Sequence, residues 1–303
     1  MIKIKTFILF FQRFFKKLIE KWQIKKIVEI ALSEDIPFTD ITSEILIPSN
    51  LRGRASFIAK EDLVICGKPV VEEVFYMLDR EIQILWQVEE GAEVKAKTKL
   101  GFVEGKIQSI LKGERVALNF LQHLSGIATY TRKLVKKLSP QCTILLDTRK
   151  TIPGLRVLQK YAVKIGGGQN HRFCLSDGIL IKDNHIKALG GIQEVINKLV
   201  NLPHYLKVEI EVKSLDELQI LLDSKAKIDV VLLDNFSLED LKKAKKLIEL
   251  KKPDLKIEIS GGITLENIEK FKEFEIDYIS SGALTHSVKA VDISLKIENI
   301  YNY

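Results

Sequence analysis

The sequence predicts a two-domain protein of the α/β and α+β classes. An N-terminal α/β sandwich domain precedes a C-terminal β/α barrel of the TIM type, and the barrel could be closed, open or incomplete. At 303 residues the chain is large for a single hydrophobic core. Its first part combines short strands, turns and one helix, as α+β domains do. After residue 142, apolar runs alternate with helical segments six times, which is typical of parallel strands buried on both faces.

The elements expected in the first part are short. A helix that opens with Pro69 is predicted over 68–78, and Glu90 and Gly91 mark a turn. A helical pattern over 114–138 connects to the second domain. Short apolar segments predict strands at 55–59, 63–67, 82–88, around residue 100, and at 107–110.

These elements predict the domain boundaries. We expect an extra amphipathic helix over 1–23, the sandwich domain over 24–126 and the barrel over 127–286, with the C-terminal tail, 287–303, as a candidate to pack on the sandwich. The first helix is basic and apolar on opposite faces, so it could lie on a membrane, but packing against the fold or a second subunit is favoured. No apolar run there is long enough for a membrane span, and no signal peptide is expected.

The balance of charge leaves several classes of partner open. The chain carries 47 Lys and Arg against 40 Asp and Glu, a formal charge of +7. Such an excess suits nucleic acid, a membrane surface or an anionic substrate as a partner. The positions of the cations in the sequence decide between these classes of partner. Many lysines lie on ordinary amphipathic helices, as over 242–246, so nucleic acid is not expected as a partner. Three cysteines without metal-ligand spacing fit a reducing cytosol, so a cytoplasmic location is expected.

In the second part, every predicted strand stops at a polar residue or a glycine. The strands are expected at 143–146, 179–181, 207–212, 230–233, 256–259 and 278–279, and helices at 155–165, 192–200, 215–222, 238–250 and 265–274. The residues at the strand ends are Asp147, Lys182, Glu211, Asp234, Ser260 and Ser281. A doubly wound sheet would concentrate function at one switch point, whereas a barrel collects it along one rim. Six polar strand ends in succession therefore favour the barrel.

The rim residues are sorted by charge along the chain. The early strands and their loops supply cations, namely Arg149, Lys150, His171, Arg172 and Lys182. The middle strands supply two carboxylates, Glu211 and Asp234. The late strands supply small residues, namely Ser260, Gly261, Gly262, Ser281 and Gly282.

Each group suits a different part of a substrate. Clustered cations need anions, and a guanidinium grips a carboxylate through paired hydrogen bonds, so an organic di-acid is expected. Two neighbouring carboxylates suit Mg²⁺ together with phosphate oxygens, and glycine-rich turns expose backbone N–H groups to phosphate. Each signal alone also has an ordinary explanation: a carboxylate can cap a helix, Gly261 and Gly262 can form a plain turn, and His123 can be structural. Their coincidence on one rim favours the functional interpretation.

These motifs resemble those of the quinolinate phosphoribosyltransferases, also called nicotinate-nucleotide pyrophosphorylases (carboxylating). The likeness runs from about residue 24 to the C-terminus, in family-like order. The matching segments cover residues 113–119, 125–129, 147–156, 160–163, 166–172, 180–185, 209–212, 233–235, 260–264 and 282–287. Such a set of long motifs is far more specific than a lone glycine pattern. Small departures, such as Gln169 and Thr39, fall on no expected ligand.

The resemblance implies an activity and a role for each rim residue. It implies transfer of a 5-phosphoribosyl group from phosphoribosyl pyrophosphate to quinolinate and then loss of CO2, which yields nicotinate mononucleotide and pyrophosphate for NAD biosynthesis. It implies that quinolinate is bound by Arg115, Arg149, Lys150, His171, Arg172 and Lys182. Arg115 would come from a neighbouring subunit of a homodimer or larger assembly. Glu211 and Asp234 would bind ribose and Mg²⁺, catalysis would rest on Lys150, Lys182, Glu211 and Asp234, and the phosphate would lie on Ser260, Gly261, Gly262, Ser281 and Gly282.

Three alternatives remain open at this point. A phosphoribosyltransferase-like paralogue associated with molybdate uptake shares the fold, but we expect it to lack the motifs at 170–172 and 182–185. An aldolase could use Lys182 to form a Schiff base. A non-catalytic basic protein could bind nucleic acid through its surplus charge, with lysines and aromatic residues interleaved on one face.

Overall fold

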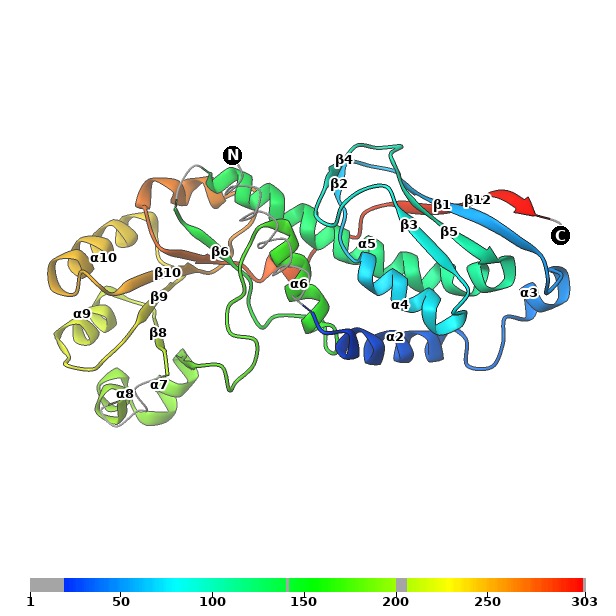
Figure 1. Ribbon diagram of the computed structural model, residues 1–303. Coiled ribbons are helices and arrows are strands. Elements are labelled where there is room, and N and C mark those ends of the chain that lie inside the picture. The colour runs from blue at the N-terminus through cyan, green and yellow to red at the C-terminus, as the bar shows by residue number, and fades with distance from the viewer. Residues whose placement is uncertain (1–18, 140–141, 200–205, 302–303) are drawn as a thin grey trace, which may run out of the picture. The chain divides into compact units, whose positions relative to one another are not determined.

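The computed structural model describes residues 19–139, 142–199 and 206–301, and it divides into two compact units (Figure 1). The first unit holds the described residues up to Arg132, together with Ile152–Gly167 and those from Val288 onward. The second holds Lys133–Thr151 and Gly168–Ser287. Most of the helix predicted over 1–23 lies outside the described residues. Within the part that is described, no helix combines the length and the apolar character that a membrane span requires.

An antiparallel sheet of four strands forms the centre of the first unit. Its order is β12-β1-β5-β3, and its members are β1 (Arg52–Ala59), β3 (Gln83–Trp86), β5 (Lys99–Lys106) and β12 (Ile293–Tyr301). The last of these comes from the C-terminal tail and pairs with β1 along its whole length. A separate pair is formed by β2 (Leu63–Val64) and β4 (Glu93–Val94).

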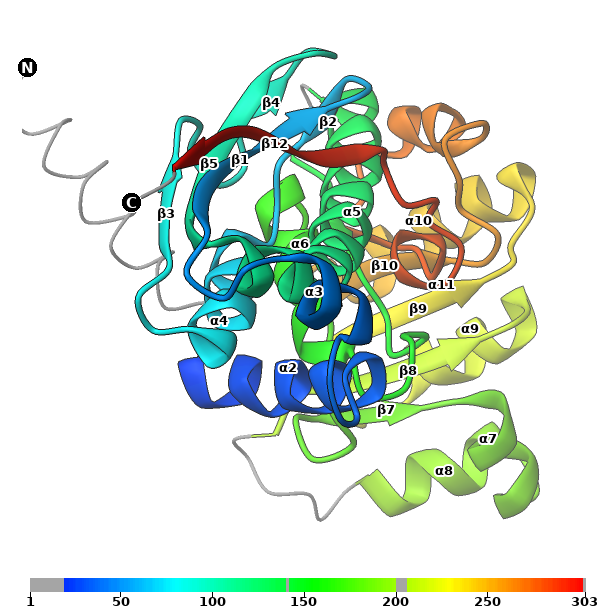
Figure 2. The ribbon, with the colours of Figure 1, turned by 90° about the vertical axis from the view of Figure 1, so that its right-hand side faces the viewer.

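Helices cover one face of this sheet, as Figure 2 shows for α4 (Lys68–Leu78) and α5 (Ile107–Leu138). The core between them is aromatic. Phe57 of β1 is fully buried, meets Phe75 of α4 edge-on with ring centroids 6.5 Å apart, and stacks on Trp86 of β3 at 5.2 Å. Burial of large rings supplies much of the stabilisation of such a small core.

The first unit differs from the prediction in several elements. The strand expected over 107–110 is wrong, because α5 begins at Ile107. Ile107 and Ile110 are both buried. Residues three positions apart lie on one face of a helix, but a short segment with two isoleucines is equally typical of a strand. Two further helices, α2 (Lys21–Asp35) and α3 (Ile41–Leu46), were not predicted.

A segment in the middle of the sequence belongs to the first unit. It contains α6 (Arg156–Gly166), which packs there through polar contacts as well as apolar ones. The hydroxyl of Tyr161 donates to the half-buried carboxylate of Glu90 at 2.8 Å, and the guanidinium of Arg132 donates to the carbonyl of Gly166 at 2.9 Å.

Six parallel strands form the sheet of the second unit. They are β6 (Ile144–Leu146), β7 (Ile179–Ile181), β8 (Val208–Val212), β9 (Val230–Asp234), β10 (Lys256–Ser260) and β11 (Tyr278–Ser280), which confirms the six predicted strands. The order is β6-β11-β10-β9-β8-β7. The first strand thus lies beside the last, as in a barrel, and β6 and β7 are the edges of the sheet. This is an open form of the predicted barrel, with its seam between β6 and β7.

Short helices connect these strands, and Figure 1 shows α9 and α10 on the outer side of β8–β10. The helices are α7 (Asp183–Leu189), α8 (Ile192–Lys198), α9 (Leu215–Asp223), α10 (Leu238–Lys251), the 3₁₀ helix η2 (Ile268–Phe274) and α11 (Ala283–His286). Two of them begin at serine caps, because the hydroxyls of Ser214 and Ser237 accept from backbone N–H groups three residues ahead. Each cap turns the chain sharply after a strand end, so the residues between strand and helix lie at the rim.

The aromatic core of the first unit gives a test of its contribution to stability. Phe57→Ala removes a fully buried ring, so we expect the free energy of unfolding to fall by about 3–5 kcal/mol. Denaturant unfolding followed by circular dichroism measures the loss. Phe38→Ala is the matched control, because that ring is 96% exposed and its removal should change the stability by less than about 0.5 kcal/mol.

Candidate active site

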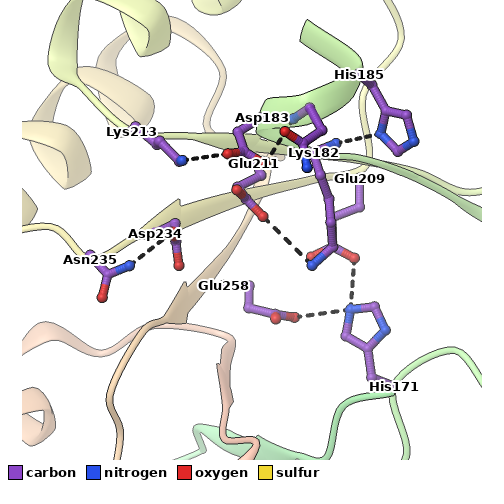
Figure 3. Close-up of polar contacts among 11 residues, drawn as sticks. His171, Lys182, Asp183, His185, Glu209, Glu211, Lys213, Asp234, Asn235 and Glu258 are labelled. Carbon is purple, nitrogen blue, oxygen red and sulfur yellow. Dashed lines mark hydrogen bonds and ion pairs between the residues drawn. The ribbon is translucent and has the colours of Figure 1, made fainter. Parts of the chain in front are cut away.

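The carboxyl ends of the parallel strands supply a continuous set of polar groups in the second unit. Glu211 is the penultimate residue of β8, Asp234 is the last residue of β9, and Ser260 ends β10. Lys182 follows β7 directly, and its ammonium lies 3.8 Å from the carboxylate of Glu211 (Figure 3). Because neighbouring strands are parallel, these ends lie along one edge of the sheet.

A buried aspartate holds the loop that carries His171 and Arg172. Asp147 follows β6 and is fully buried. Its carboxylate accepts from the side-chain amide of Asn170 at 2.6 Å and from the backbone N–H of His171 at 2.9 Å. The first strand end therefore positions the cation-bearing loop and does not itself present a charge to the solvent.

The arginines of this arc are prepared to receive an anion. Burial and the nearby cation of Arg149 lower the pKa of Arg172. One guanidinium nitrogen of Arg172, Nη1, donates to the carbonyl of Gly178 at 3.3 Å, while Nε is buried and has no hydrogen-bond partner among the described residues. A buried donor without a partner costs free energy that a bound carboxylate or phosphate would recover.

Lys150 and Gly282 lie against each other. The carbonyl of Lys150 accepts from the hydroxyl of Thr285 at 2.8 Å, which fixes the backbone beside α11. A Cβ atom on Gly282 would lie 2.9 Å from Cδ of Lys150, so the absence of a side chain at position 282 makes room for the stem of the lysine. The cationic arc and the last glycine turn are thus neighbours.

Two carboxylates lie together in the middle of the rim. Glu211 is only 7% exposed, and burial, with the negative charge of Asp234 added, raises its pKa. The ammonium of Lys182 opposes this shift. Two carboxylates so close together are a natural pair of ligands for a hard divalent cation, which would relieve the repulsion that Asp234 exerts on Glu211.

The next residue, Asn235, is held in an unusual conformation. It has a left-handed backbone with φ of 57°, its side-chain amide donates to the carboxylate of Asp234 at 2.9 Å, and its backbone N–H donates to Ser260 at 3.0 Å. Its side chain occupies the space where a Cβ atom of Gly261 would lie, and Gly261 itself has φ of 106°. Glycine at 261 therefore admits Asn235, which in turn orients Asp234.

Ser281 is placed differently from the glycines beside it. It is 2% exposed, its hydroxyl donates to the carbonyl of Ile263 at 2.7 Å, and its backbone N–H donates to Leu146 at 3.0 Å. The hydroxyl proton is therefore committed to the loop after β10. Gly262, by contrast, has φ of 59° and open space where a side chain would begin.

His171 and two carboxylates inside the sheet were not assigned a site together from the sequence. Nε2 of His171 lies 2.9 Å from Glu209 and 3.7 Å from Glu258 (Figure 3). One feature of the sequence could have indicated this cluster: Glu258 is an acidic residue in the middle of the predicted strand 256–259. Asn235 likewise lies in the segment 233–235, which matches the family, but the sequence predicted no role for it.

Two other residues lie outside this edge. Arg115 is exposed on α5 and belongs to the first unit. His123, on the same helix, lies 2.9 Å from the side-chain amide of Gln159, and its structural role stays a prediction. The glycines at 166 and 167 form the end of α6, with Gly167 left-handed at φ of 99°.

The contact between Gly261 and Asn235 can be measured as a stability difference. Gly261→Ala adds both backbone strain and an overlap with the Asn235 side chain, so we expect a loss of about 2–4 kcal/mol in the free energy of unfolding. Gly190→Ala is the control, because Gly190 has φ of 91° and open space, and it should lose only the backbone part, about 1 kcal/mol. In the Gly261→Ala background, Asn235→Gly should relieve the overlap and restore part of the lost free energy of unfolding. If the stability does not rise, the packing described is contradicted.

Both domains of one family match this chain. The model of the quinolinate phosphoribosyl transferase N-terminal domain matches residues 40–125, and that of the C-terminal domain matches residues 127–296. The chain is 40% identical over 295 residues to the chloroplastic nicotinate-nucleotide pyrophosphorylase [carboxylating] of Arabidopsis thaliana, covering 91% of this chain and 83% of the relative. It is also 40% identical over 276 residues to the probable enzyme of the same name from Bacillus subtilis, covering 91% and 93%.

A solved structure agrees with these relatives. The nicotinate-nucleotide pyrophosphorylase from Francisella tularensis is 41% identical, covers 92% of this chain and 98% of its own, and superposes with a TM-score of 0.85. The family, the two-domain fold and the resemblance of the motifs therefore agree. The chain belongs to the quinolinate phosphoribosyl transferase family, whose members are decarboxylating phosphoribosyltransferases.

Proposed function

We propose that this chain transfers a 5-phosphoribosyl group from phosphoribosyl pyrophosphate to the ring nitrogen of quinolinate and then releases CO2, giving nicotinate mononucleotide for NAD biosynthesis. The observation that carries the proposal is the sorting of one sheet edge into a cationic arc, a carboxylate pair and a glycine-rich turn. The names of the relatives favour this reaction over an aldolase or a nucleic-acid-binding role.

The cationic arc would bind the two carboxylates of quinolinate. The buried and unpartnered Nε of Arg172 is the strongest support, because an incoming oxygen satisfies a donor that the protein leaves open. Lys182, with a half-exposed side chain, can reach a substrate without being drawn out of a buried ion pair. The remaining members of the arc are Arg149, Lys150 and His171.

The carboxylate pair fits Mg²⁺ by the chemistry of its donors, since Glu211 and Asp234 are close enough to raise a pKa by mutual repulsion. When bound, Mg²⁺ would offset the negative charge that develops on pyrophosphate as it leaves. The same two side chains would bind the ribose hydroxyls. Asn235 would keep Asp234 turned toward that position.

The glycine-rich turns would hold the 5-phosphate. Gly262 leaves open space beside its backbone, so an anion can approach the loop Ser260-Gly261-Gly262 closely. Gly282 offers a second backbone N–H, and Ser281 supports the turn through its bond to Ile263. With both reactants held, orientation supplies a large part of the rate.

The two chemical steps balance within the substrates. The ring nitrogen forms the bond to C1′ of the ribose as the bond from C1′ to pyrophosphate breaks. The ring then carries a positive charge on nitrogen, which accepts the electron pair released at C2 when the bond to the departing CO2 breaks. A proton from water or a rim acid completes the product. We propose Lys150 and Lys182 as the cations that stabilise the developing charges.

We also propose a homodimer or larger assembly in which Arg115 enters the quinolinate site of a neighbouring subunit. Its exposure on α5 supports this role, because an exposed arginine on a helix is available to a partner. A cytoplasmic location is proposed on the absence of a membrane-spanning helix in the described residues and on three free cysteines.

An assay with the purified protein tests the reaction. We expect CO2 release and nicotinate mononucleotide only when quinolinate, phosphoribosyl pyrophosphate and Mg²⁺ are all present, and a chelator should stop both. Lys182→Ala should lower the rate by at least about 100-fold, because a positioned cation at a developing charge contributes that much. Lys187→Ala, on the exposed side of α7, is the control and should remain active. No turnover at any Mg²⁺ concentration would refute the proposal.

A mixing experiment tests the shared site. Arg115→Ala and Lys182→Ala should each be inactive yet folded. When the two are unfolded and refolded together, mixed dimers contain one site with both residues intact, so we expect a partial return of activity. Mixing Lys182→Ala with Glu211→Gln should return little, because those residues come from the same subunit. Full activity of Arg115→Ala alone would show that Arg115 does not complete the site of a neighbouring subunit.

A further inference from the structure

Two carboxylates and one imidazole form a buried cluster beneath the cationic arc. The side chain of Glu258, on β10, is 2% exposed, that of Glu209, on β8, is 12% exposed, and that of His171 is 13% exposed. One potential ligand atom from each lies within 4.8 Å of the others, and Figure 3 shows the three side chains pointing toward one another. We name these three residues the acid cluster.

The hydrogen bonds of His171 decide which of its nitrogens carries the proton. The backbone N–H of Arg172 donates to Nδ1 at 2.7 Å, so Nδ1 presents its lone pair. The proton of the neutral ring is then on Nε2, where it faces Glu209 at 2.9 Å. A metal ion at Nε2 would have to displace this proton while Nδ1 still faced a donor, so the cluster is built around protons and not around a metal.

A count of protons leaves the acid cluster one short. If both carboxyl groups were ionised, two buried negative charges would share the N–H of His171 and the hydroxyl of Ser280, which bonds to Glu258. Oε1 of Glu209 and Oε1 of Glu258 are both buried without a hydrogen-bond partner among the described residues. Buried charges without partners are strongly unfavourable. A proton on one carboxyl group removes one charge and supplies a new donor.

Glu258 is the group that retains this proton. Burial, with the negative charge of Glu209 added, raises the pKa of Glu258 to about 7. The other groups that face it act in the opposite direction: they are His171, the hydroxyl of Ser280 on β11, and the ammonium of Lys182 at the end of β7. Near neutral pH the charge of the cluster therefore depends on one side chain.

We propose that Glu258 is a positioning acid whose neutral form gives the cationic arc its affinity for quinolinate, an inference that rests on the proposed function. The arc lies beside the cluster, since His171 belongs to both and Lys182 acts on Glu258. A substrate that carries two negative charges is repelled by every ionised carboxylate in reach of its pocket. A neutral Glu258 adds no repulsion and leaves the charge of Lys182 to the substrate, although Glu258 itself does not touch it.

The direction of the pH effect follows from this arrangement. Below about pH 7 Glu258 is neutral and quinolinate binds tightly; above it Glu258 ionises and binding weakens. By linkage, bound quinolinate must raise the proton affinity of Glu258, so binding takes up protons from solution near neutral pH. The carboxyl groups of quinolinate are ionised throughout this range and do not contribute.

Direct binding measured by calorimetry between pH 6 and pH 9 tests the proposal. For the unmodified protein we expect the Kd for quinolinate to rise toward about tenfold per pH unit above neutrality, with proton uptake detected in buffers of different ionisation enthalpy. Glu258→Gln keeps the shape of a neutral acid and cannot ionise, so its Kd should stay low and change little with pH. Glu194→Gln makes the same change at an exposed position on α8 and should follow the unmodified protein.

Infrared difference spectroscopy gives a second readout that needs no substrate. The carbonyl band of a neutral carboxylic acid should disappear as the pH is raised through neutrality and should be missing in Glu258→Gln. If that variant does not fold, Glu209→Gln replaces it, and removal of the neighbouring charge should move both the band and the binding midpoint to lower pH.

The outcomes separate this proposal from the proposed function. A protein that turns over quinolinate but shows a flat binding profile, or a Glu258→Gln variant with the pH dependence of the unmodified protein, would overturn the role of Glu258 alone. A protein that neither binds nor converts quinolinate at any pH would overturn the proposed function and this inference with it.

Discussion

Parallel pairing of six short strands determines where the polar groups of the second unit can lie. The strands contain three to five residues each, and most of these residues are buried. Most of the polar groups lie at or near the carboxyl end of each strand, where they leave the apolar residues of the core in place. Because every neighbouring pair runs in the same direction, these positions all open on one edge. Site and core are thus products of one hydrogen-bonding pattern.

Groups of like charge are placed side by side at this edge. Arg149 acts on Arg172, Asp234 acts on Glu211, and Glu209 acts on Glu258. A fold gains nothing from such pairs, since each one raises the free energy of the folded state. Each repulsion would be relieved by a different species: an anion for the arginines, a cation for Glu211 and Asp234, and a proton for Glu209 and Glu258. The like-charge pairs lower the stability of the folded protein and favour the binding of the species that relieve their repulsion.

The sequence predicted the barrel strands well because its apolar runs are bounded sharply by polar residues. It predicted α4 to the residue because Pro69 marks the start of that helix. The start of α5 was missed since Ile107 and Ile110 fit either a helix or a strand when only a few residues are considered. The pairing of β12 with β1 joins residues more than 200 positions apart, and no local pattern can report such a contact.

The candidate site divides in the same way. Residues that end strands, such as Lys182 and Glu211, could be selected from the sequence because position and residue type coincide. Glu258 could not be selected as easily, since its importance depends on Glu209 and His171, which meet it only in three dimensions. The left-handed backbone of Asn235 and the close approach of its side chain to Gly261 are also invisible in a linear pattern.

The last strand has a consequence for the order of events during synthesis. β1 is among the first strands to leave the ribosome, but one of its two neighbours, β12, is among the last. Until the chain is released, β1 exposes an open edge of unpaired N–H and C=O groups along eight residues. The second unit lies earlier in the chain than β12 and has all six of its strands available by then, so it can fold while the first unit is still waiting. Loss of β12 would leave that edge permanently open, far in sequence from most of the groups that perform the chemistry.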